Sequence, residues 1–183
     1  IRVWKMANVD CRLGGAEKIV QIDESVLHKA KYHRGHVLYE PIKWIFGIYD
    51  IEKKKGLGFL VQDRKAQTLL PIIQQYVLPG TEIHSDCWGA YRKISELPVN
   101  PPYIHRTVNH THYFKDPVTA VHTNNVEAYW SSVKRRFKMY NGISRTGTMP
   151  HICEHAYRQR FGKTIEDMLQ NFIMDIGHMN MFN

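Results

Sequence analysis

Three acidic side chains stand out in this sequence because a strongly basic chain needs a reason to gather negative charge. Asp23 and Asp86 each follow an apolar, strand-like run, and Glu127 lies near the start of a helical pattern. Carboxylates that are held close together repel one another, so a fold that gathers them normally places a divalent cation between them. Carboxylate oxygens are hard ligands that suit Mg²⁺ or Mn²⁺. The three acids therefore indicate metal-assisted phosphoryl transfer on a nucleic acid.

Each acid also has a purely structural interpretation. An aspartate at the end of a strand often caps the following turn, and Asp86 stands directly before a short helical segment. Glu127 fits an ordinary solvated helix face, where most charged residues lie. Glu24 is an ambiguous neighbour, since the two-residue period of a strand turns it to the opposite face from Asp23. We therefore prefer Asp23 over Glu24 as the ligand.

The elements that position the first two acids follow from hydrophobic periodicity. We expect strands at 18–23, 44–49 and 58–61, which form an antiparallel meander with a hairpin turn at 53–56. A helix is expected at 65–76, with Asp63 as its cap. A fourth strand at 82–86, reached through this crossover helix, should lie parallel to its neighbour in the sheet. Asp23 and Asp86 then end neighbouring strands and face each other.

The second half of the chain is expected to be mainly helical. The pattern predicts a short helix at 88–95, a fifth strand at 104–108, and helices at about 124–140, 151–161 and 164–176. A meander, a helix and a parallel strand, with acids at two strand ends, follow the order of an RNase H-like (retroviral-integrase-like) α/β fold, a mixed sheet flanked by helices. We divide the chain into a lead-in segment (1–17), a catalytic core (18–145) and a helical extension of the same domain (146–183).

Helical phase places the third acid. At 100° per residue, the helix that begins near residue 124 has a narrow apolar stripe, which we take as its core face. The stripe consists of Val126, Trp130, Val133 and Phe137. Glu127 and Lys134 lie about two turns apart on a neighbouring flank. A metal-binding carboxylate and a phosphate-binding ammonium are thus expected along one groove.

The charge of the chain favours a polyanionic partner. It has 25 Lys and Arg against 17 Asp and Glu, a net charge of +8 and a pI near 9.4. The candidate DNA contacts are Lys134, Arg135 and Arg136 on the late helix, Asn109, His110, His122 and Asn124 before or at its start, and Lys29, Lys31 and Arg34 after the first strand. A zinc module is the alternative for the eleven histidines, but the chain has no CxxC pair, and no cysteine lies near the histidines at positions 105–122. The tryptophans are expected to be core anchors rather than base-stacking platforms.

Cysteine usage and hydropathy bear on the compartment. The three cysteines are far apart and odd in number, which fits a reducing, intracellular compartment: the nucleus in a eukaryote, the cytoplasm or nucleoid in a bacterium. No apolar run reaches the length of a membrane span, so no membrane partner is expected. The chain begins with Ile1, which suggests a fragment of a longer protein.

Several segments together resemble transposases with an ISXO2-like (IS1595-type) domain and their eukaryotic relatives, the Merlin elements. The segments are Ile22–Ser25, Asp63–Ile73, Pro79–Thr81, Ser85–Tyr91, Val108–His110, Phe114–Pro117, His122–Asn124, Val126–Glu127, Trp130, Lys134–Arg136 and Tyr157–Phe161. The resemblance implies an RNase H-like core that cuts and joins DNA at element ends, with Asp23, Asp86 and Glu127 as its acidic triad. Some bacterial relatives carry Asn as the third residue, which makes Asn124 an additional candidate. Glu127 and the ending Tyr157–Phe161 favour the Merlin-like branch, whereas Ala120-Val121 departs from the Gly-Ala pair common in the family.

The resulting expectation is a transposase catalytic domain that binds Mg²⁺ or Mn²⁺, as two ions, through Asp23, Asp86 and Glu127. Lys134 would hold phosphate, and neither a nucleophilic Ser or Cys nor a small-molecule cofactor is required. The expected partners are transposon terminal inverted repeats, target DNA and further copies of the chain on paired ends. The alternative is a domesticated, transposase-derived DNA-binding protein without transposition activity.

Overall fold

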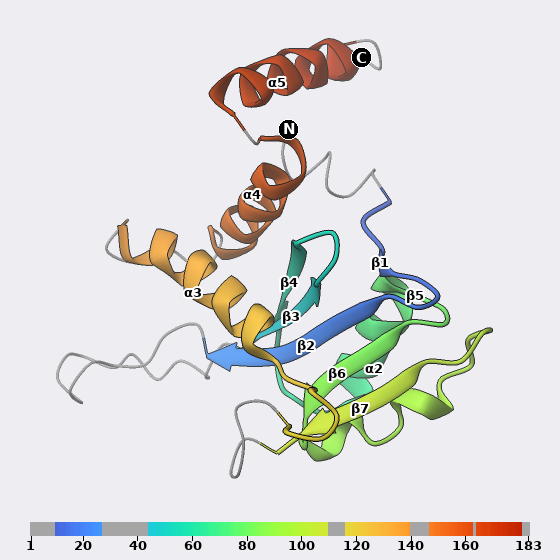
Figure 1. The fold of residues 1–183 in the computed structure, drawn as a ribbon. Helices are drawn as coiled ribbons and strands as arrows, with labels where there is room; N and C mark the ends of the chain where they lie inside the picture. The colour runs from blue at the N-terminus through green and yellow to red at the C-terminus, as the bar shows by residue number, and fades with distance from the viewer. Residues whose placement is uncertain (1–9, 27–43, 110–115, 140–146, 163, 181–183) are drawn as a thin grey trace, which may run out of the picture.

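A five-stranded mixed sheet forms the centre of the protein in the computed structural model, which describes residues 10–26, 44–109, 116–139, 147–162 and 164–180 (Figure 1). Its strands are β2 (Ile19–Val26), β3 (Trp44–Asp50), β4 (Lys55–Val61), β6 (Glu82–Asp86) and β7 (Ile104–Val108), in the order β4-β3-β2-β6-β7. β2, β3 and β4 form an antiparallel meander, whereas β6 lies parallel to both β2 and β7. The sheet order confirms the expected RNase H-like α/β fold.

Helices cover both faces of this sheet. α2 (Ala66–Tyr76) lies on one face, and α3 (Asn124–Met139) and α4 (Thr148–Phe161) lie on the other (Figure 1). α5 (Ile165–Asn180) follows α4, and two short strands, β1 (Leu13–Gly14) and β5 (Val77–Leu78), pair in parallel beside the main sheet. Within the described ranges, none of the helices is both long enough and apolar enough to cross a lipid bilayer.

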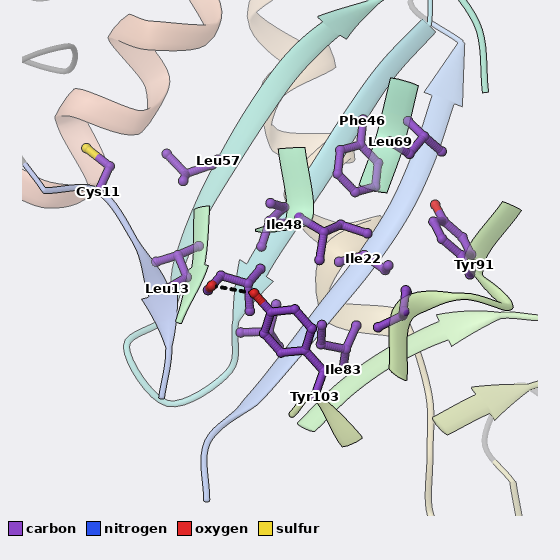
Figure 2. Close-up of a cluster of buried hydrophobic side chains, with 14 of the residues drawn as sticks. Cys11, Leu13, Ile22, Phe46, Ile48, Leu57, Leu69, Ile83, Tyr91 and Tyr103 are labelled. Carbon is purple, nitrogen blue, oxygen red and sulfur yellow. Dashed lines mark hydrogen bonds between the residues drawn. The ribbon is translucent and has the colours of Figure 1, made fainter. Parts of the chain in front are cut away.

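The core between the sheet and α2 is built from alternate positions of the strands, as the two-residue period of a strand requires. Ile22 of β2 and Phe46 and Ile48 of β3 are fully buried there against Leu69 of α2. Figure 2 shows these side chains converging between the elements, with the Tyr103 hydroxyl donating a hydrogen bond to the Val77 carbonyl at 2.8 Å. Burial of this apolar cluster fixes β2 and β6 in the middle of the sheet, where the acids lie.

The second core lies under α3 and α4. The predicted apolar stripe of α3 is buried, with Val126, Trp130, Val133 and Phe137 each at most 4% exposed. Ile45 of β3 packs against this stripe, and the strand residues beside it are small. A Cβ atom on Gly47 or Gly56 would collide with the Trp130 or Tyr129 ring, respectively. Glycine in these strands therefore lets two large aromatic side chains of α3 lie directly on the sheet.

Adding one methyl group at Gly47 is a direct test of this close approach. We expect Gly47→Ala to lower the free energy of unfolding by about 2 kcal/mol, because the indole of Trp130 has to move away from the strand. Chemical denaturation followed by circular dichroism measures the change. Gly89→Ala is the matched control, since a Cβ atom at Gly89 meets no atom within 4 Å. Equal stability of the two variants would contradict the packing described here.

Several expected boundaries were wrong. β2 continues through Val26, because β3 pairs with it as far as Trp44, so Asp23 lies inside a strand rather than at its end. The expected hairpin turn at 53–56 lies instead at 51–54, and β4 begins at Lys55. The pair of short strands β1 and β5 was not expected, since strands of two residues are too short to show a hydrophobic period.

The helical boundaries also shifted. α2 begins at Ala66 with Lys65 as its N-cap, and Asp63 lies too early to cap it. The Asp63 carboxylate instead accepts hydrogen bonds from the Lys65 N–H and the Thr68 hydroxyl. The expected helix at 88–95 is two separate 3₁₀ turns, η2 (Gly89–Tyr91) and η3 (Ile94–Glu96). α4 begins three residues earlier than expected and α5 ends four residues later. The division into segments at 17 and 145 stays a prediction.

Candidate active site

A cluster of three carboxylates lies where β2 passes the end of β6. Asp23, Glu24 and Asp86 each offer an oxygen, and these oxygens all lie within 4.8 Å of one another. β2 and β6 pair in parallel, with Gln21 opposite His84. Continuing this register by two residues along each strand places Asp23 beside Asp86. β6 ends at Asp86, as expected. Sheet topology therefore places acids from two distant segments in one group.

The cluster is electrostatically unfavourable without a counter-ion. Burial raises the pKa of Asp23 to about 7, and the charges of Glu24, Asp86 and Glu127 add to this effect. Burial also raises the pKa of Glu24, with a further contribution from Asp86, while Tyr91 and Arg64 act in the opposite direction. The surrounding acids thus make Asp23 and Glu24 harder to ionise, which is the condition that a bound divalent cation relieves.

One oxygen of the cluster supports the fit to a cation directly. Oε1 of Glu24 is buried and has no hydrogen-bond partner among the described residues. A buried acid elsewhere in the protein looks different: Asp50 is fully buried, but its oxygens accept hydrogen bonds from the N–H groups of Gly14 and Lys53. A hard cation would complete the coordination that Glu24 lacks.

Glu24 enters this cluster although β-strand alternation turns it away from Asp23. Its side chain lies on the same face as Tyr91, and burial together with the charge of Glu24 raises the pKa of that tyrosine. β6 ends at Asp86, and an oxygen of the longer glutamate side chain lies within 4.8 Å of oxygens of Asp23 and Asp86. From the sequence we preferred Asp23 over Glu24 as a metal ligand, but the structure places the carboxylates of both residues in one cluster.

Glu127 stands beside the cluster rather than in it. It lies in the first turn of α3, where its carboxylate accepts a hydrogen bond from the Thr123 hydroxyl at 3.0 Å. Among the described acids, the group whose oxygens lie within 4.8 Å of one another does not include Glu127. The charge of Glu127 nevertheless contributes to the raised pKa of Asp23. Glu127 is exposed.

Gln21 fixes the start of α3 relative to β2. Its fully buried side-chain oxygen accepts hydrogen bonds from the Asn125 and Val126 N–H groups at 2.9 and 3.1 Å. Its amide nitrogen donates to the His122 carbonyl at 2.7 Å. The first N–H groups of a helix have no partner within the helix, so a strand side chain that binds two of them sets the position of the helix. Because Gln21 is two residues before Asp23, it points to the same strand face as Asp23.

The expected DNA contacts are only partly described by the structure. Lys134 donates a hydrogen bond to the Ser25 hydroxyl at 2.6 Å, so it lies against β2 two residues beyond Asp23. Arg135, Asn124 and Asn109 are exposed, and the His122 ring contacts the Gln21 amide. His110, Lys29, Lys31 and Arg34 lie outside the described residues, as does the side chain of Arg136. The described histidines His84 and His105 pair with Glu82 and Ser85.

One tryptophan departs from the expected role of core anchor. Trp130 is buried, but the Trp88 ring is 41% exposed directly after Asp86. The guanidinium carbon of Arg64 lies 4.0 Å from the ring centre of Trp44 and 4.4 Å from that of Trp88. Neither Arg64 nor Gln21 was predicted as a site residue, although Arg64 belongs to a segment that carries the family resemblance. The signal for Gln21 was available, since a polar residue two positions before Asp23 interrupts the apolar strand.

Cation binding should be visible as stabilisation of the fold. At pH 8, above the pKa of Asp23, we expect Mg²⁺ at a hundred times its dissociation constant to raise the melting temperature by about 5–10 °C. The physical reason is relief of repulsion among the three clustered carboxylates. Differential scanning calorimetry with and without Mg²⁺, at equal ionic strength set with KCl, measures the shift. The same shift with KCl alone would show general screening rather than a site.

The chain matches a known protein family over most of its length. Residues 13–160 match the family described as ISXO2-like transposase domain. An uncharacterized transposase-like protein of Haemophilus influenzae is 28% identical over 106 residues, which cover 58% of this chain and 81% of that protein.

Among solved structures, the catalytic core domain of BIV integrase aligns with a TM-score of 0.48 and 16% identity, over 80% of this chain and 84% of that one. The HTLV-2 integrase catalytic core domain in complex with magnesium aligns with a TM-score of 0.49 and 13% identity, over 80% and 87%. On the extent of the family match, this chain belongs to the ISXO2-like transposase domain family.

Proposed function

We propose that the protein is the catalytic domain of a transposase that cleaves DNA strands at transposon ends and transfers them to target DNA. The observation that carries the proposal is the group of Asp23, Glu24 and Asp86, whose oxygens lie within 4.8 Å of one another beside Glu127. Membership of a transposase family makes DNA the substrate that fits this site and the positive net charge.

Asp23, Asp86 and Glu127 would hold the Mg²⁺ or Mn²⁺ ions, expected as a pair, with Glu24 as a further oxygen donor. When bound, such ions activate a water molecule or a DNA 3′-hydroxyl for in-line attack and neutralise charge on the phosphodiester. Lys134, held against β2 by Ser25, would bind the phosphate on the α3 side of the acids. Gln21 would keep Glu127 at a constant distance from Asp23 by holding the first turn of α3.

The partners proposed for this site are the terminal inverted repeats, the target DNA and further copies of the chain on paired ends. The glutamate at position 127 is also the basis for proposing the Merlin-like branch of the family.

A cleavage and strand-transfer assay on candidate terminal repeats tests the proposal. We expect products with Mg²⁺ or Mn²⁺ and none with EDTA, and loss of products when any one of the three triad acids is replaced by its amide. Glu52→Gln is the matched control, since Glu52 is exposed and pairs with Lys18 away from the cluster. DNA binding without cleavage under all metal conditions would refute the proposal and leave a transposase-derived DNA-binding protein.

A further inference from the structure

A rigid aromatic surface lies directly beside the carboxylate cluster. The Trp88 indole N–H donates a hydrogen bond to the Arg64 carbonyl at 3.0 Å, and the Trp88 backbone N–H donates to Oδ1 of Asp86 at 2.9 Å. Two hydrogen bonds and the Arg64 guanidinium thus hold a ring that is 41% exposed. A large apolar ring on the surface ordinarily has no such restraints, so its fixed position indicates a binding role.

An open surface depression of about 540 Å³ lies beside this ring. It is lined by residues 63–66 and 88–90, that is, by the segment before α2 and the turn after β6. Small-molecule sites generally measure about 300–1,000 Å³, so this depression can hold a group as large as a nucleotide. Gly89 keeps part of the wall open, since a Cβ atom added there would meet nothing within 4 Å.

The charges at the depression suit a phosphate. Among the described residues, the guanidinium N–H groups of Arg64 have neither a carboxylate nor a carbonyl partner, because the guanidinium lies over the Trp44 and Trp88 rings. Ring stacking uses the face of a guanidinium and leaves its N–H edge available for two parallel hydrogen bonds to a phosphate. Lys65 also lies at the rim, where its ammonium pairs with the Asp63 carboxylate at 3.7 Å, so Arg64 is the cation available to a phosphate.

We propose that this depression binds one unpaired nucleotide of DNA, with its base stacked on Trp88 and its phosphate held by Arg64. A base presents its face to an indole only after it leaves the duplex stack, so the ligand is a single-stranded or flipped nucleotide. Trp88 is two residues from Asp86, at most about 7 Å of chain, so the bound nucleotide lies next to the phosphodiester at the carboxylate cluster. The location of that phosphodiester rests on the proposed function, whereas the binding of an unpaired nucleotide does not.

Binding measured in EDTA tests the depression separately from catalysis. The probe is a DNA duplex with a short single-stranded overhang that carries the fluorescent base 2-aminopurine. We expect the wild-type chain to quench this fluorescence and to bind the overhang duplex more tightly than the blunt duplex of the same sequence. Trp88→Ala should lose the quenching and weaken overhang binding about tenfold, with blunt-duplex binding changed less than twofold.

Gly89→Leu is the second variant, because it adds a bulky side chain to a residue that lines the depression, where a Cβ atom meets no atom within 4 Å. It should reproduce the loss seen with Trp88→Ala. Ile104→Ala, which removes an exposed apolar side chain from β7, is the control and should bind both duplexes like the wild type. Unchanged quenching and binding in Gly89→Leu, or an equal loss for both duplexes, would overturn the proposal.

The two proposals fail in different ways. Asp86→Asn keeps the oxygen that accepts the Trp88 N–H, so it should quench 2-aminopurine in EDTA like the wild type. A wild-type chain that quenches but never cleaves with Mg²⁺ would remove the proposed function and leave the nucleotide site. A chain that cleaves with Mg²⁺ but never quenches would do the reverse.

Discussion

Replacing Asp86 by asparagine is expected to lower metal-dependent strand cleavage by about a thousandfold or more while leaving the fold intact. The amide oxygen can still accept the Trp88 N–H, so the turn after β6 keeps its hydrogen bond. The substitution removes one negative charge from a group whose oxygens lie within 4.8 Å of one another, and with it the attraction for a divalent cation. Cleavage of labelled terminal-repeat DNA, with Mg²⁺ in excess, measures the loss.

The same variant should be more stable than the wild type when no divalent cation is present. Removing one carboxylate relieves repulsion on Asp23 and Glu24, and we expect a gain of about 1 kcal/mol in the free energy of unfolding at pH 8. The stabilisation by Mg²⁺ should shrink accordingly. Glu52→Gln removes a charge of the same sign from an exposed salt bridge and should show neither effect. An Asp86→Asn variant that cleaves at the wild-type rate, or loses stability in EDTA, would contradict the assignment of this acid.

Replacing Gln21 by methionine is expected to have the second largest effect. Methionine is similar in size but leaves the Asn125 and Val126 N–H groups and the His122 carbonyl without the partner that binds all three. Because the site is fully buried, we expect a loss of about 3 kcal/mol in the free energy of unfolding. Cleavage should fall about a hundredfold even at a temperature where the variant is folded, because the first turn of α3 carries Glu127.

A variant of equal instability separates positioning from stability. Leu69→Ala empties a fully buried site in α2, on the opposite face of the sheet, and should cost a similar 2–5 kcal/mol. Assayed at a temperature at which both chains are folded, Leu69→Ala should keep the wild-type kcat and Mg²⁺ dependence, whereas Gln21→Met should lose kcat. Equal kcat values in the two variants would show that Gln21 contributes stability only.

The order of the sheet and the phase of α3 followed from the sequence because both depend on regular periods. The 100° step along α3 separated Trp130 from Glu127, and burial agrees, since Trp130 is 3% exposed and Glu127 is exposed. Helices have to cover both apolar faces of the sheet, so few arrangements of these strands and helices were possible.

The details of the site did not follow, because they depend on individual side chains rather than on periods. Alternation assigns Glu24 to the face opposite Asp23, but an oxygen of its longer side chain lies within 4.8 Å of oxygens of Asp23 and Asp86. A preference for burial predicted Trp88 in the core, but its indole N–H donates to the backbone carbonyl of Arg64, 24 residues earlier in the chain. Gln21 gains its role from a helix more than a hundred residues away.

That separation in sequence has a consequence for the newly made chain. Gln21 meets Asn125 across 104 residues, and Ser25 meets Lys134 across 109. Contacts of such long range form slowly, after the shorter-range meander of β2, β3 and β4. On the ribosome, Gln21 and Ser25 of β2 cannot make these contacts until α3 has been synthesised and has left the exit tunnel. An incomplete chain that ends before α3 therefore carries Asp23 and Asp86 without Glu127 and Lys134, and on the proposed function it would be unable to cut DNA.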